Sequence, residues 1–330
     1  MADSTMKVVL GTMEIGRGAL SEDTPSFELL DAYFTEGQEL DTALMYAGGN
    51  SELIIGRYLT ARSLQEKAVI ATKANPFGSH EKNLAREGVL AQAALSLQRL
   101  QASSVDIFYL HAPDHDTPIE ETLEAVQQLY TDGKFKELGL SNFASWEVAN
   151  VYQICKSRGW VLPTVYQGMY NPITRMVESE LLPCLRHFGI RFYAYNPLAG
   201  GMLTERYYRS GLDTPQDGRF WTVGGDWAVK YRDRFWRESV FRGVECVRGA
   251  LDECYGVGVV SLVRAAFRWL NHHSAINAKY NDAIIVGVSK MEHLKANMAA
   301  CQEGPLDERV VKAFDEAWKM DAINCAKYYR

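Results

Sequence analysis

The chain has 330 residues, 47% of them hydrophobic, and a formal net charge of −6. This composition is typical of a globular protein with a large core, and the mild acidity argues against a general nucleic-acid binder, which needs a concentrated positive surface. No run approaches the roughly 20 apolar residues of a membrane span, and the six cysteines form no CxxC pair, so we expect no membrane partner, reduced thiols and a cytoplasmic location.

Short apolar runs alternate with amphipathic stretches along the chain. The runs predict eight strands, at Lys7–Leu10, Glu39–Asp41, Val69–Thr72, Asp106–Tyr109, Glu137–Leu140, Thr164–Gln167, Arg191–Ala194 and Ala283–Val286. The stretches between them predict helices at Phe27–Glu36, Glu52–Ala61, Asn83–Leu100, Ile119–Thr131, Trp146–Ser157, Val177–His187, Val259–Asn271 and Met291–Cys301. Near-continuous apolar strands separated by helices are typical of a parallel sheet covered by helices. Eight such units favour an α/β fold of the closed (β/α)8 TIM-barrel type, with residues 1–330 forming a single domain.

Single residues mark where several of these helices begin and end. Gly37, Gly133 and Gly189 follow the first, fourth and sixth helices, where a left-handed residue commonly ends a helix. Ser145 precedes the fifth helix and is expected to cap its amino terminus. These positions support the predicted boundaries.

The segment Leu198–Gly258, between the seventh and eighth strands, is too long for a simple connection. It is rich in glycine, tryptophan, tyrosine and arginine. Long connections in compact domains are usually functional or disordered, and the aromatic content argues against disorder. We therefore expect a long active-site loop and an extra helix around Val240–Glu253.

Four polar residues end or closely follow early predicted strands: Asp41, Tyr46, Lys73 and His111. Because the carboxyl ends of all strands in a parallel barrel meet at one face, we expect these side chains to lie close together. A cationic Lys73 would lower the pKa of Tyr46 from about 10, while Asp41 would keep a buried Lys73 charged. His111 would donate a hydrogen bond to a carbonyl oxygen. Together they form a general-acid arrangement for carbonyl reduction, in which a nicotinamide supplies the hydride and no metal is needed.

Each of the four residues also has a plainer structural interpretation. Taken singly, Asp41 is more often a cap and Lys73 a solvated strand end. His111 is more often a hydrogen-bonded loop histidine, and Tyr46 a half-buried packing residue. Their joint placement at successive strand ends favours the catalytic interpretation.

These residues lie in motifs that resemble the aldo-keto reductase family over essentially the whole chain. The matching segments are DTALMYAGGNSE, ATK, VDIFYLHAPD, GLSNF and YNPLAGGMLT. The segments MYAGGNSE, YNPLAGGMLT, WAVKYRDRFW and the terminal KYYR are most similar to the aflatoxin-aldehyde reductase subfamily. The resemblance implies a (β/α)8 barrel that binds NADPH without a Rossmann fingerprint, and no GxGxxG follows the first strand. It also makes a homodimer the expected assembly.

The resemblance implies which residues contact NADPH. Ser141 and Asn142 would bond the nicotinamide carboxamide, and Tyr195 would stack on the nicotinamide ring. Gly200 and Gly201 would let backbone N–H groups approach the pyrophosphate. The full expected set is Asp41, Ser141, Asn142, Gln167, Tyr195, Asn196, Pro197, Leu198, Gly200, Gly201, Leu203, Arg206, Arg219, Gly287, Ser289, Lys290, His293 and Asn297.

The eighth strand leads into a helix whose amino terminus, by the resemblance, would hold the adenosine 2′-phosphate. Ser289 and Lys290 stand at that terminus, and a helix amino terminus favours anions. Arg219 is a second candidate for this phosphate. Lys290 and His293 depart from the residues that relatives often have, so the contact set stays open. The structural alternative for Lys290 is a solvated helix face.

The resemblance also implies substrate contacts at the rim of the barrel. Tyr231, Arg234 and Arg330 would bind a substrate carboxylate, for which an arginine fork is suited; a surface stacking or salt-bridge role is the alternative. An apolar wall is expected from Met13 and the rim aromatics Trp221, Trp227 and Trp236. The full expected set of substrate residues is Met13, Tyr46, His111, Asn142, Tyr231, Arg234 and Arg330.

The expected function is therefore NADPH-dependent reduction of aldehydes to alcohols, with the hydride from the nicotinamide and the proton from Tyr46. Dicarbonyls and carboxylated aldehydes are further candidate substrates. Two alternatives stay open: a pathway-specific carbonyl reductase of secondary metabolism, and a slow-turnover NADPH-binding regulatory subunit that senses redox state. The intact set of four polar residues argues against an inactive barrel, whereas Leu198–Gly258 would select the carbonyl.

Overall fold

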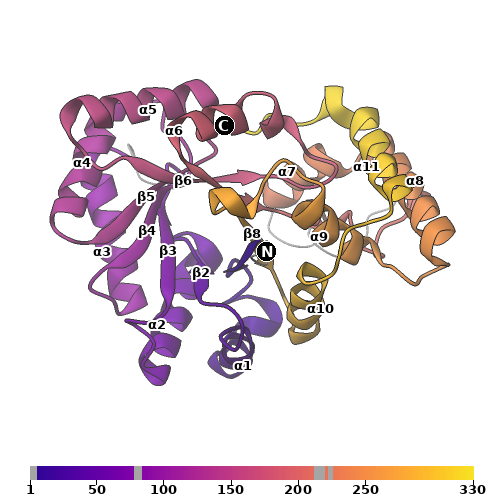
Figure 1. The fold of residues 1–330 in the computed structure, drawn as a ribbon. Helices are drawn as coiled ribbons and strands as arrows, with labels where there is room; N and C mark the ends of the chain where they lie inside the picture. Colours follow the sequence, from indigo (N-terminus) through magenta and orange to yellow (C-terminus); the bar gives the residue numbers. More distant parts are fainter. Residues whose placement is uncertain (1–5, 78–83, 212–219, 222–225) are drawn as a thin grey trace.

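Eight parallel strands close into a barrel in chain order, with β8 paired to β1. The computed structural model describes residues 6–77, 84–211, 220–221 and 226–330, with 226 and 227 as backbone only (Figure 1). All neighbouring strands pair in parallel, so their carboxyl ends lie on one face. The strands are β1 Lys7–Gly11, β2 Glu39–Asp41, β3 Val69–Ala74, β4 Val105–Leu110, β5 Phe135–Ser141, β6 Pro163–Met169, β7 Arg191–Tyr195 and β8 Ala283–Gly287. This arrangement confirms the predicted (β/α)8 barrel.

Helices connect the strands and surround the barrel (Figure 1). The α-helices are α1 Asp23–Tyr33, α2 Asn50–Arg62, α3 Arg86–Leu100, α4 Ile119–Thr131, α5 Ser145–Arg158, α6 Leu181–Phe188, α7 Asp226–Phe235, α8 Glu238–Tyr255, α9 Leu262–His272, α10 Met291–Cys301 and α11 Glu308–Asp321. Short 3-10 segments are η1 Gly18–Leu20, η2 Tyr46–Gly49, η3 Met176–Glu178, η4 Ala199–Gly201, η5 Arg209–Gly211, η6 Ala278–Tyr280 and η7 Ala322–Asn324.

The predicted helix Val177–His187 is divided in the structure between η3 and α6. Pro183 lies in the first turn of α6, where its missing N–H costs little. A helix running unbroken from Val177 would place the same proline in its interior, where it removes a hydrogen bond and clashes with the preceding turn. The chain therefore starts a new helix at Leu181.

The long segment after β7 contains the expected extra helix, α8, and also α7, where the sequence predicts a loop. Ala228, Tyr231 and Phe235 follow helical spacing, but the surrounding arginines and tryptophans obscured that pattern. A Cβ on Gly200 would lie 2.8 Å from the Tyr231 ring, so α7 packs closely on the turn that follows β7. The described part of this segment is therefore largely helical, and α7 covers the turn that follows β7.

Helix α11 was missing from the predicted elements although its sequence carries a clear signal. Val310, Ala313, Phe314 and Ala317 form a buried stripe at helical spacing. The stripe packs on α8, where a Cβ added at Gly243 would lie 2.9 Å from the Cβ of Ala317. Figure 1 shows the two helices side by side at the edge of the barrel. Helix α11 thus lies outside the eight strand–helix units predicted from the sequence.

Two of the predicted helix-end residues need correction. Gly133 and Gly189 have φ of 65° and 68°, as expected, whereas Gly37 does not have positive φ. Gly37 is instead needed for space, because a Cβ there would lie 2.2 Å from the ring of Tyr33. Ser145 is the first residue of α5 and not its N-cap, which is Ala144. The backbone N–H of Ala144 donates to the Glu147 carboxylate, and this hydrogen bond stabilises the start of the helix.

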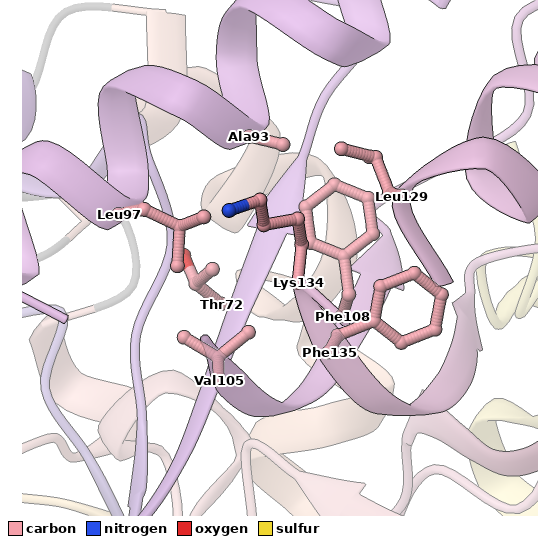
Figure 2. Close-up of a pocket in the computed structure, with 8 residues that line it drawn as sticks. All are labelled: Thr72, Ala93, Leu97, Val105, Phe108, Leu129, Lys134 and Phe135. Atoms are coloured by element: carbon pink, nitrogen blue, oxygen red, sulfur yellow. The ribbon is translucent and has the colours of Figure 1, made fainter. Parts of the chain in front are cut away.

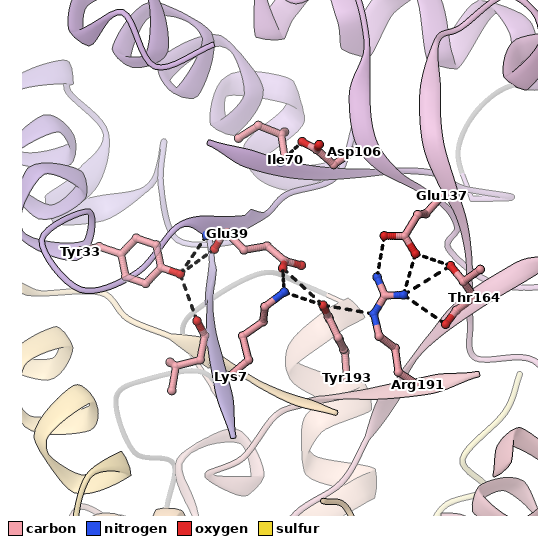
Figure 3. A network of polar contacts seen from close by, with 10 residues as sticks. Lys7, Tyr33, Glu39, Ile70, Asp106, Glu137, Thr164, Arg191 and Tyr193 are labelled. Atoms are coloured by element: carbon pink, nitrogen blue, oxygen red, sulfur yellow. Dashed lines mark hydrogen bonds and ion pairs between the residues drawn. The ribbon is translucent and has the colours of Figure 1, made fainter. Parts of the chain in front are cut away.

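A network of charged side chains closes the amino-terminal end of the barrel (Figure 3). Lys7 Nζ lies 2.6 Å from Glu39 Oε2, and Arg191 bonds Glu137 through two nitrogens at 2.7 and 3.1 Å. The Tyr193 hydroxyl lies between them, 3.2 Å from Lys7 Nζ and 3.4 Å from Arg191 Nε. An open cavity of about 330 Å³ adjoins this end. In barrels of this type the opposite, carboxyl end carries the chemistry.

A small gap behind the sheet is too confined for a ligand (Figure 2). It measures about 10 Å³ and lies between α3, α4 and the neighbouring strands, with Thr72, Val105 and Phe108 among its lining residues. That volume is about the size of one water molecule. Among the described residues, no helix is both long enough and apolar enough to cross a membrane.

Candidate active site

A buried lysine and a buried carboxylate form an ion pair near the carboxyl ends of β2 and β3. Lys73 Nζ lies 2.7 Å from Asp41 Oδ1 and 2.7 Å from the backbone oxygen of Thr42. Gln167, which was expected beside the nicotinamide, donates to the same Asp41 oxygen at 2.8 Å. The Lys73 and Asp41 side chains are 0% and 3% exposed, so water does not replace either partner. Burial lowers the pKa of Lys73, and the charge of Asp41 opposes that shift.

Tyr46 and His111 lie around this pair. The Lys73 ammonium lies 5.3 Å from the centroid of the Tyr46 ring. The Tyr46 and His111 rings meet edge to face, with their centroids 6.0 Å apart. Tyr46 begins η2, and the three residues after it all have positive φ. The structure therefore brings the four residues together at the carboxyl end of the barrel.

The electrostatic setting of Tyr46 differs from the expectation. Burial raises the pKa of Tyr46 well above its ordinary value, the charge of Asp41 adds to the rise, and Arg17 opposes it. The pKa of Tyr46 is therefore raised and not lowered as expected, because burial and the charge of Asp41 outweigh the groups that favour the phenolate. Tyr46 is a neutral phenol that retains its proton.

His111 is held through its backbone, while one ring nitrogen lacks a partner. The backbone N–H of His111 donates to the backbone oxygen of Ala74 at 2.8 Å, and its backbone carbonyl accepts from the side-chain amide of Asn142 at 2.8 Å. Nδ1 is buried and has no hydrogen-bond partner among the described residues. Burial lowers the pKa of His111 well below 6.5, and the charges of Lys73 and Arg330 add to the effect. The imidazole is therefore neutral and has one N–H to offer.

This shift predicts that carbonyl reduction is insensitive to the ordinary titration of histidine. A histidine with a lowered pKa stays neutral as the pH falls through 6.5, whereas an unshifted one would gain a proton there. We therefore expect kcat/KM to stay level from about pH 8 down to about pH 6. A pH–rate profile at saturating cofactor checks this. A fall in kcat/KM with an apparent pKa near 6.5 that vanishes in His111→Asn would contradict it.

The residues expected to hold the nicotinamide form one hydrogen-bonded group beside His111. Tyr195, at the end of β7, donates to Asn142 Oδ1 at 2.9 Å. Asn142 Nδ2 also donates to Ser141 Oγ at 2.9 Å. Asn142 has a φ of 61°, a left-handed conformation that asparagine tolerates. An amide and an aromatic ring are thus held together beside the backbone of His111.

In the turn after β7, the backbone N–H groups expected to approach a pyrophosphate already have acceptors within the protein. The N–H of Gly200 donates to Asn196 Oδ1 at 2.7 Å, and that of Gly201 to the oxygen of Leu198 at 2.9 Å. The two glycines have φ of 69° and 108°, so they shape the turn. Arg206 is exposed here and is the candidate left for binding a phosphate. Of the remaining expected residues, Pro197 and Leu203 are buried.

The amino terminus of α10 gathers several residues expected to bind a phosphate. Ser289 Oγ lies 3.3 Å from His293 Nδ1, and the exposed Lys290 directly follows Ser289 in the chain. Lys290 is the N-cap of α10 and makes no side-chain capping hydrogen bond, so the first N–H groups lack a side-chain acceptor at the cap. Of the other expected residues, Gly287 is exposed at the end of β8, Asn297 is buried within α10, and Arg219 lies outside the described residues.

Arg330 and Arg234, the two arginines expected to bind a substrate carboxylate, lie close enough to Tyr195 for both charges to oppose the rise that burial causes in its pKa. The backbone N–H of Arg330 donates a hydrogen bond to the backbone oxygen of Asn142 at 3.0 Å. Burial lowers the pKa of Arg330, Tyr195 opposes this, and the like charge of Arg234 lowers it further. Two neighbouring positive charges favour an anion between them. Of the other rim residues, Met13, Tyr231, Trp221 and Trp236 are half-buried, and the Trp227 side chain lies outside the described residues.

Sequence reasoning missed two residues that act on the cluster. The Tyr109 ring lies 5.3 Å from the Lys73 ammonium and forms a second aromatic face beside it. Tyr109 lies in β4 two residues before His111, which directly follows the strand. Because side chains alternate along an extended chain, the two point to the same side, and this spacing identifies Tyr109 from the sequence. Arg17 opposes the rise in the Tyr46 pKa from a loop after β1, where no sequence pattern marked it.

Comparison with known proteins places this geometry in a family. The sequence matches the Aldo/keto reductase family over residues 7–319. It is 52% identical over 325 residues to "Aflatoxin B1 aldehyde reductase member 2" of Rattus norvegicus, covering 98% of this chain and 87% of that protein. It is 50% identical over 325 residues to "Aflatoxin B1 aldehyde reductase member 4" of Homo sapiens, with 97% and 96% covered. An aldo-keto reductase of Pseudocercospora fijiensis is 39% identical over 305 residues, with 91% and 100% covered. The chain therefore belongs to the aldo/keto reductase family of oxidoreductases.

Proposed function

We propose that the protein reduces aldehydes to alcohols with NADPH as the hydride source. The observation that carries this proposal is the buried Asp41–Lys73 pair, with Tyr46 and His111 against it at the carboxyl end of the barrel. The similarity to proteins named for aflatoxin B1 aldehyde supports an aldehyde as substrate. A single barrel domain spanning residues 1–330 would hold both cofactor and substrate.

Each of the four residues has its own role in protonating the carbonyl oxygen. Tyr46 donates its phenolic proton to the carbonyl oxygen as negative charge develops there. Lys73, kept charged by Asp41, stabilises the phenolate that remains. Neutral His111 donates a hydrogen bond that orients the carbonyl group. The burial of Lys73 and Asp41 excludes water from their ion pair and strengthens it. When bound, NADPH would supply the hydride that the carbonyl carbon accepts.

Residues beyond the tetrad fit an anionic dinucleotide. The Asn142–Tyr195 pair offers an amide and a ring to the nicotinamide, and the exposed Arg206 offers charge to the pyrophosphate. The terminus of α10, with Ser289 and Lys290, combines a helix dipole with a cation, which suits the additional phosphate of NADPH. These groups support NADPH over NADH.

Carboxylated aldehydes are the substrate class that the two arginines favour. We expect Arg330→Leu and Arg234→Leu to raise KM for succinic semialdehyde by roughly 10-fold or more, because a charged hydrogen bond is lost, with a smaller change for neutral 4-nitrobenzaldehyde. Arg242→Leu, at an exposed position of α8, is the matched control. Equal changes in KM for both aldehydes would reject a carboxylate site.

The direct test of the function is a reduction assay. Purified protein is mixed with NADPH and a panel containing 4-nitrobenzaldehyde and succinic semialdehyde, and nicotinamide absorbance is followed together with alcohol formation. The proposal requires turnover on aldehydes and a preference for NADPH over NADH. Tight NADPH binding without turnover on any aldehyde, ketone or quinone would favour a redox-sensing subunit instead. Turnover confined to one ketone would favour a pathway-specific reductase.

We also infer a cytoplasmic location and a homodimer. All six cysteines are free thiols, which suits a reducing compartment. The homodimer rests on the resemblance to the aflatoxin-aldehyde reductase subfamily. Light scattering on the purified chain of 37.1 kDa measures the assembly directly, and a mass of one chain would reject the dimer.

A further inference from the structure

The loop that carries Tyr46 has a strained backbone. Ala47, Gly48 and Gly49 follow Tyr46 with φ of 50°, 65° and 97°, so three consecutive residues are left-handed. Ala47 is strained in this region because it carries a Cβ. Such a backbone persists only where surrounding contacts fix it. The position of the phenol therefore depends on what holds this loop.

Arg99, near the end of α3, contacts the loop on both sides of Tyr46. Its Nη1 donates to the oxygen of Leu44 at 3.3 Å, two residues before the tyrosine. Its guanidinium lies against Gly49, where an added Cβ would be 2.1 Å from Nη1. The N–H of Leu44 also donates to the backbone oxygen of Lys73 at 3.4 Å. The arginine thus binds the loop where it meets the strand of Lys73.

A close helix crossing allows Arg99 to reach this position. At Gly56 an added Cβ would lie 2.2 Å from the backbone oxygen of Arg99 and 2.8 Å from the carbonyl carbon of Leu100. These are backbone atoms, which cannot move aside as a side chain can. The absence of a side chain at Gly56 therefore lets the end of α3 lie directly on α2, which begins where the loop ends.

A buried carboxylate lies behind the arginine. Glu52, in the first turn of α2, is fully buried, and its Oε2 lies 3.9 Å from Arg99 Nη1. That oxygen has no hydrogen-bond partner among the described residues. Glu52 Oε1 accepts from Thr72 Oγ1 at 2.6 Å, and Thr72 directly precedes Lys73. The contacts from Arg99 through Glu52 to Thr72 therefore join the two segments that carry Tyr46 and Lys73.

We propose that Arg99 and Glu52 are positioning residues that hold the Tyr46 loop in register with Lys73 for proton donation. The inference rests on the proposed reductase function and extends it. Arg99 contacts the backbone at Leu44 and Gly49, so it acts through the loop. A displacement of the phenol by about 1 Å would slow the chemical step by about 100-fold. Apart from Asp41, which Lys73 and Gln167 hold in place, the groups assigned to the cofactor lie on other segments and would keep their contacts.

The central test is Arg99→Met, which keeps an apolar stem and removes the guanidinium. We expect kcat to fall by about 100-fold while the Kd for NADPH stays at the wild-type value. The isotope effect with NADPH deuterated at the transferred position of C4 should rise or reach its full value, because the chemical step becomes slower. Arg99→Lys should recover part of kcat, since it restores a charged donor toward Leu44.

Arg62→Met is the matched control. Arg62 also lies near a helix end, on α2, and bonds Asp31 at 2.8 and 2.7 Å, but it does not touch the Tyr46 loop. Its replacement should leave kcat at the wild-type value. Glu52→Gln is the milder second variant; it keeps an acceptor for Thr72, removes the charge and should lower kcat in the same direction. It provides the test if Arg99→Met does not fold.

The outcomes separate this inference from the function on which it rests. A wild-type chain without turnover on the whole panel would refute the proposed function. A wild-type chain that turns over, beside Arg99→Met and Glu52→Gln with unchanged kcat, would overturn only the positioning role. Parallel losses of kcat, NADPH affinity and melting temperature, with no recovery in Arg99→Lys, would also overturn it, because they indicate general loss of structure.

Discussion

Tyr46→Phe is expected to lower kcat for aldehyde reduction by about 10²–10⁴-fold, with NADPH affinity close to that of the wild type. The substitution removes the phenolic proton and keeps the ring that meets His111 and lies beside the Lys73 ammonium. Burial raises the pKa of Tyr46, so the wild-type phenol is neutral and its proton is present for transfer. Steady-state kinetics and fluorescence titration with NADPH measure the two quantities separately.

Tyr58→Phe is the control for loss of a tyrosine hydroxyl. Tyr58 is buried on α2, and its hydroxyl donates to Asp31 at 3.0 Å, away from the Tyr46 cluster. Its replacement should leave kcat unchanged. Near-normal turnover in Tyr46→Phe, beside a normal Tyr58→Phe, would show that another group donates the proton.

The features that the sequence predicted well are those that depend on neighbouring residues in the chain. Each strand is a short apolar run, and the parallel barrel brings every strand end to one face. The positions of Asp41, Lys73 and His111 just past such runs were therefore enough to predict their meeting. Tyr46 was grouped with them because it follows Asp41 by one short loop, although the conformation of that loop was not predicted.

The features that were missed depend on contacts between distant segments. Whether Lys73 lowers the pKa of Tyr46 depends on how fully the phenol is buried and on where the ammonium charge is neutralised. Gly37 is a glycine because the ring of Tyr33 fills the space beside it, and not because of its own φ. Arg99 lies more than fifty positions from Leu44 in the sequence, so no local pattern could connect them. Such relations become visible only when the helices are packed.

The electrostatics of the site and its stability are linked through one ion pair. Asp41 raises the pKa of Tyr46, which disfavours the phenolate, yet it also opposes the loss of the Lys73 proton. An unpaired lysine at 0% exposure would lose its charge more readily, and the stabilisation of the phenolate would go with it. The carboxylate therefore weakens the ground-state acidity of Tyr46 while preserving the cation needed during proton transfer.

Lys73→Met should nearly abolish reduction and also destabilise the fold by about 3–5 kcal/mol, because it leaves the Asp41 carboxylate buried without its cation. Gln167 would be the remaining side-chain donor to Asp41 Oδ1, at 2.8 Å, and an amide does not balance a full charge. Urea unfolding and kcat measure the two effects. The double variant Lys73→Met/Asp41→Asn should recover much of the stability, since the buried charge is gone, but none of the turnover. Recovery of turnover in the double variant would show that Lys73 serves only to neutralise Asp41 and takes no part in stabilising the Tyr46 phenolate.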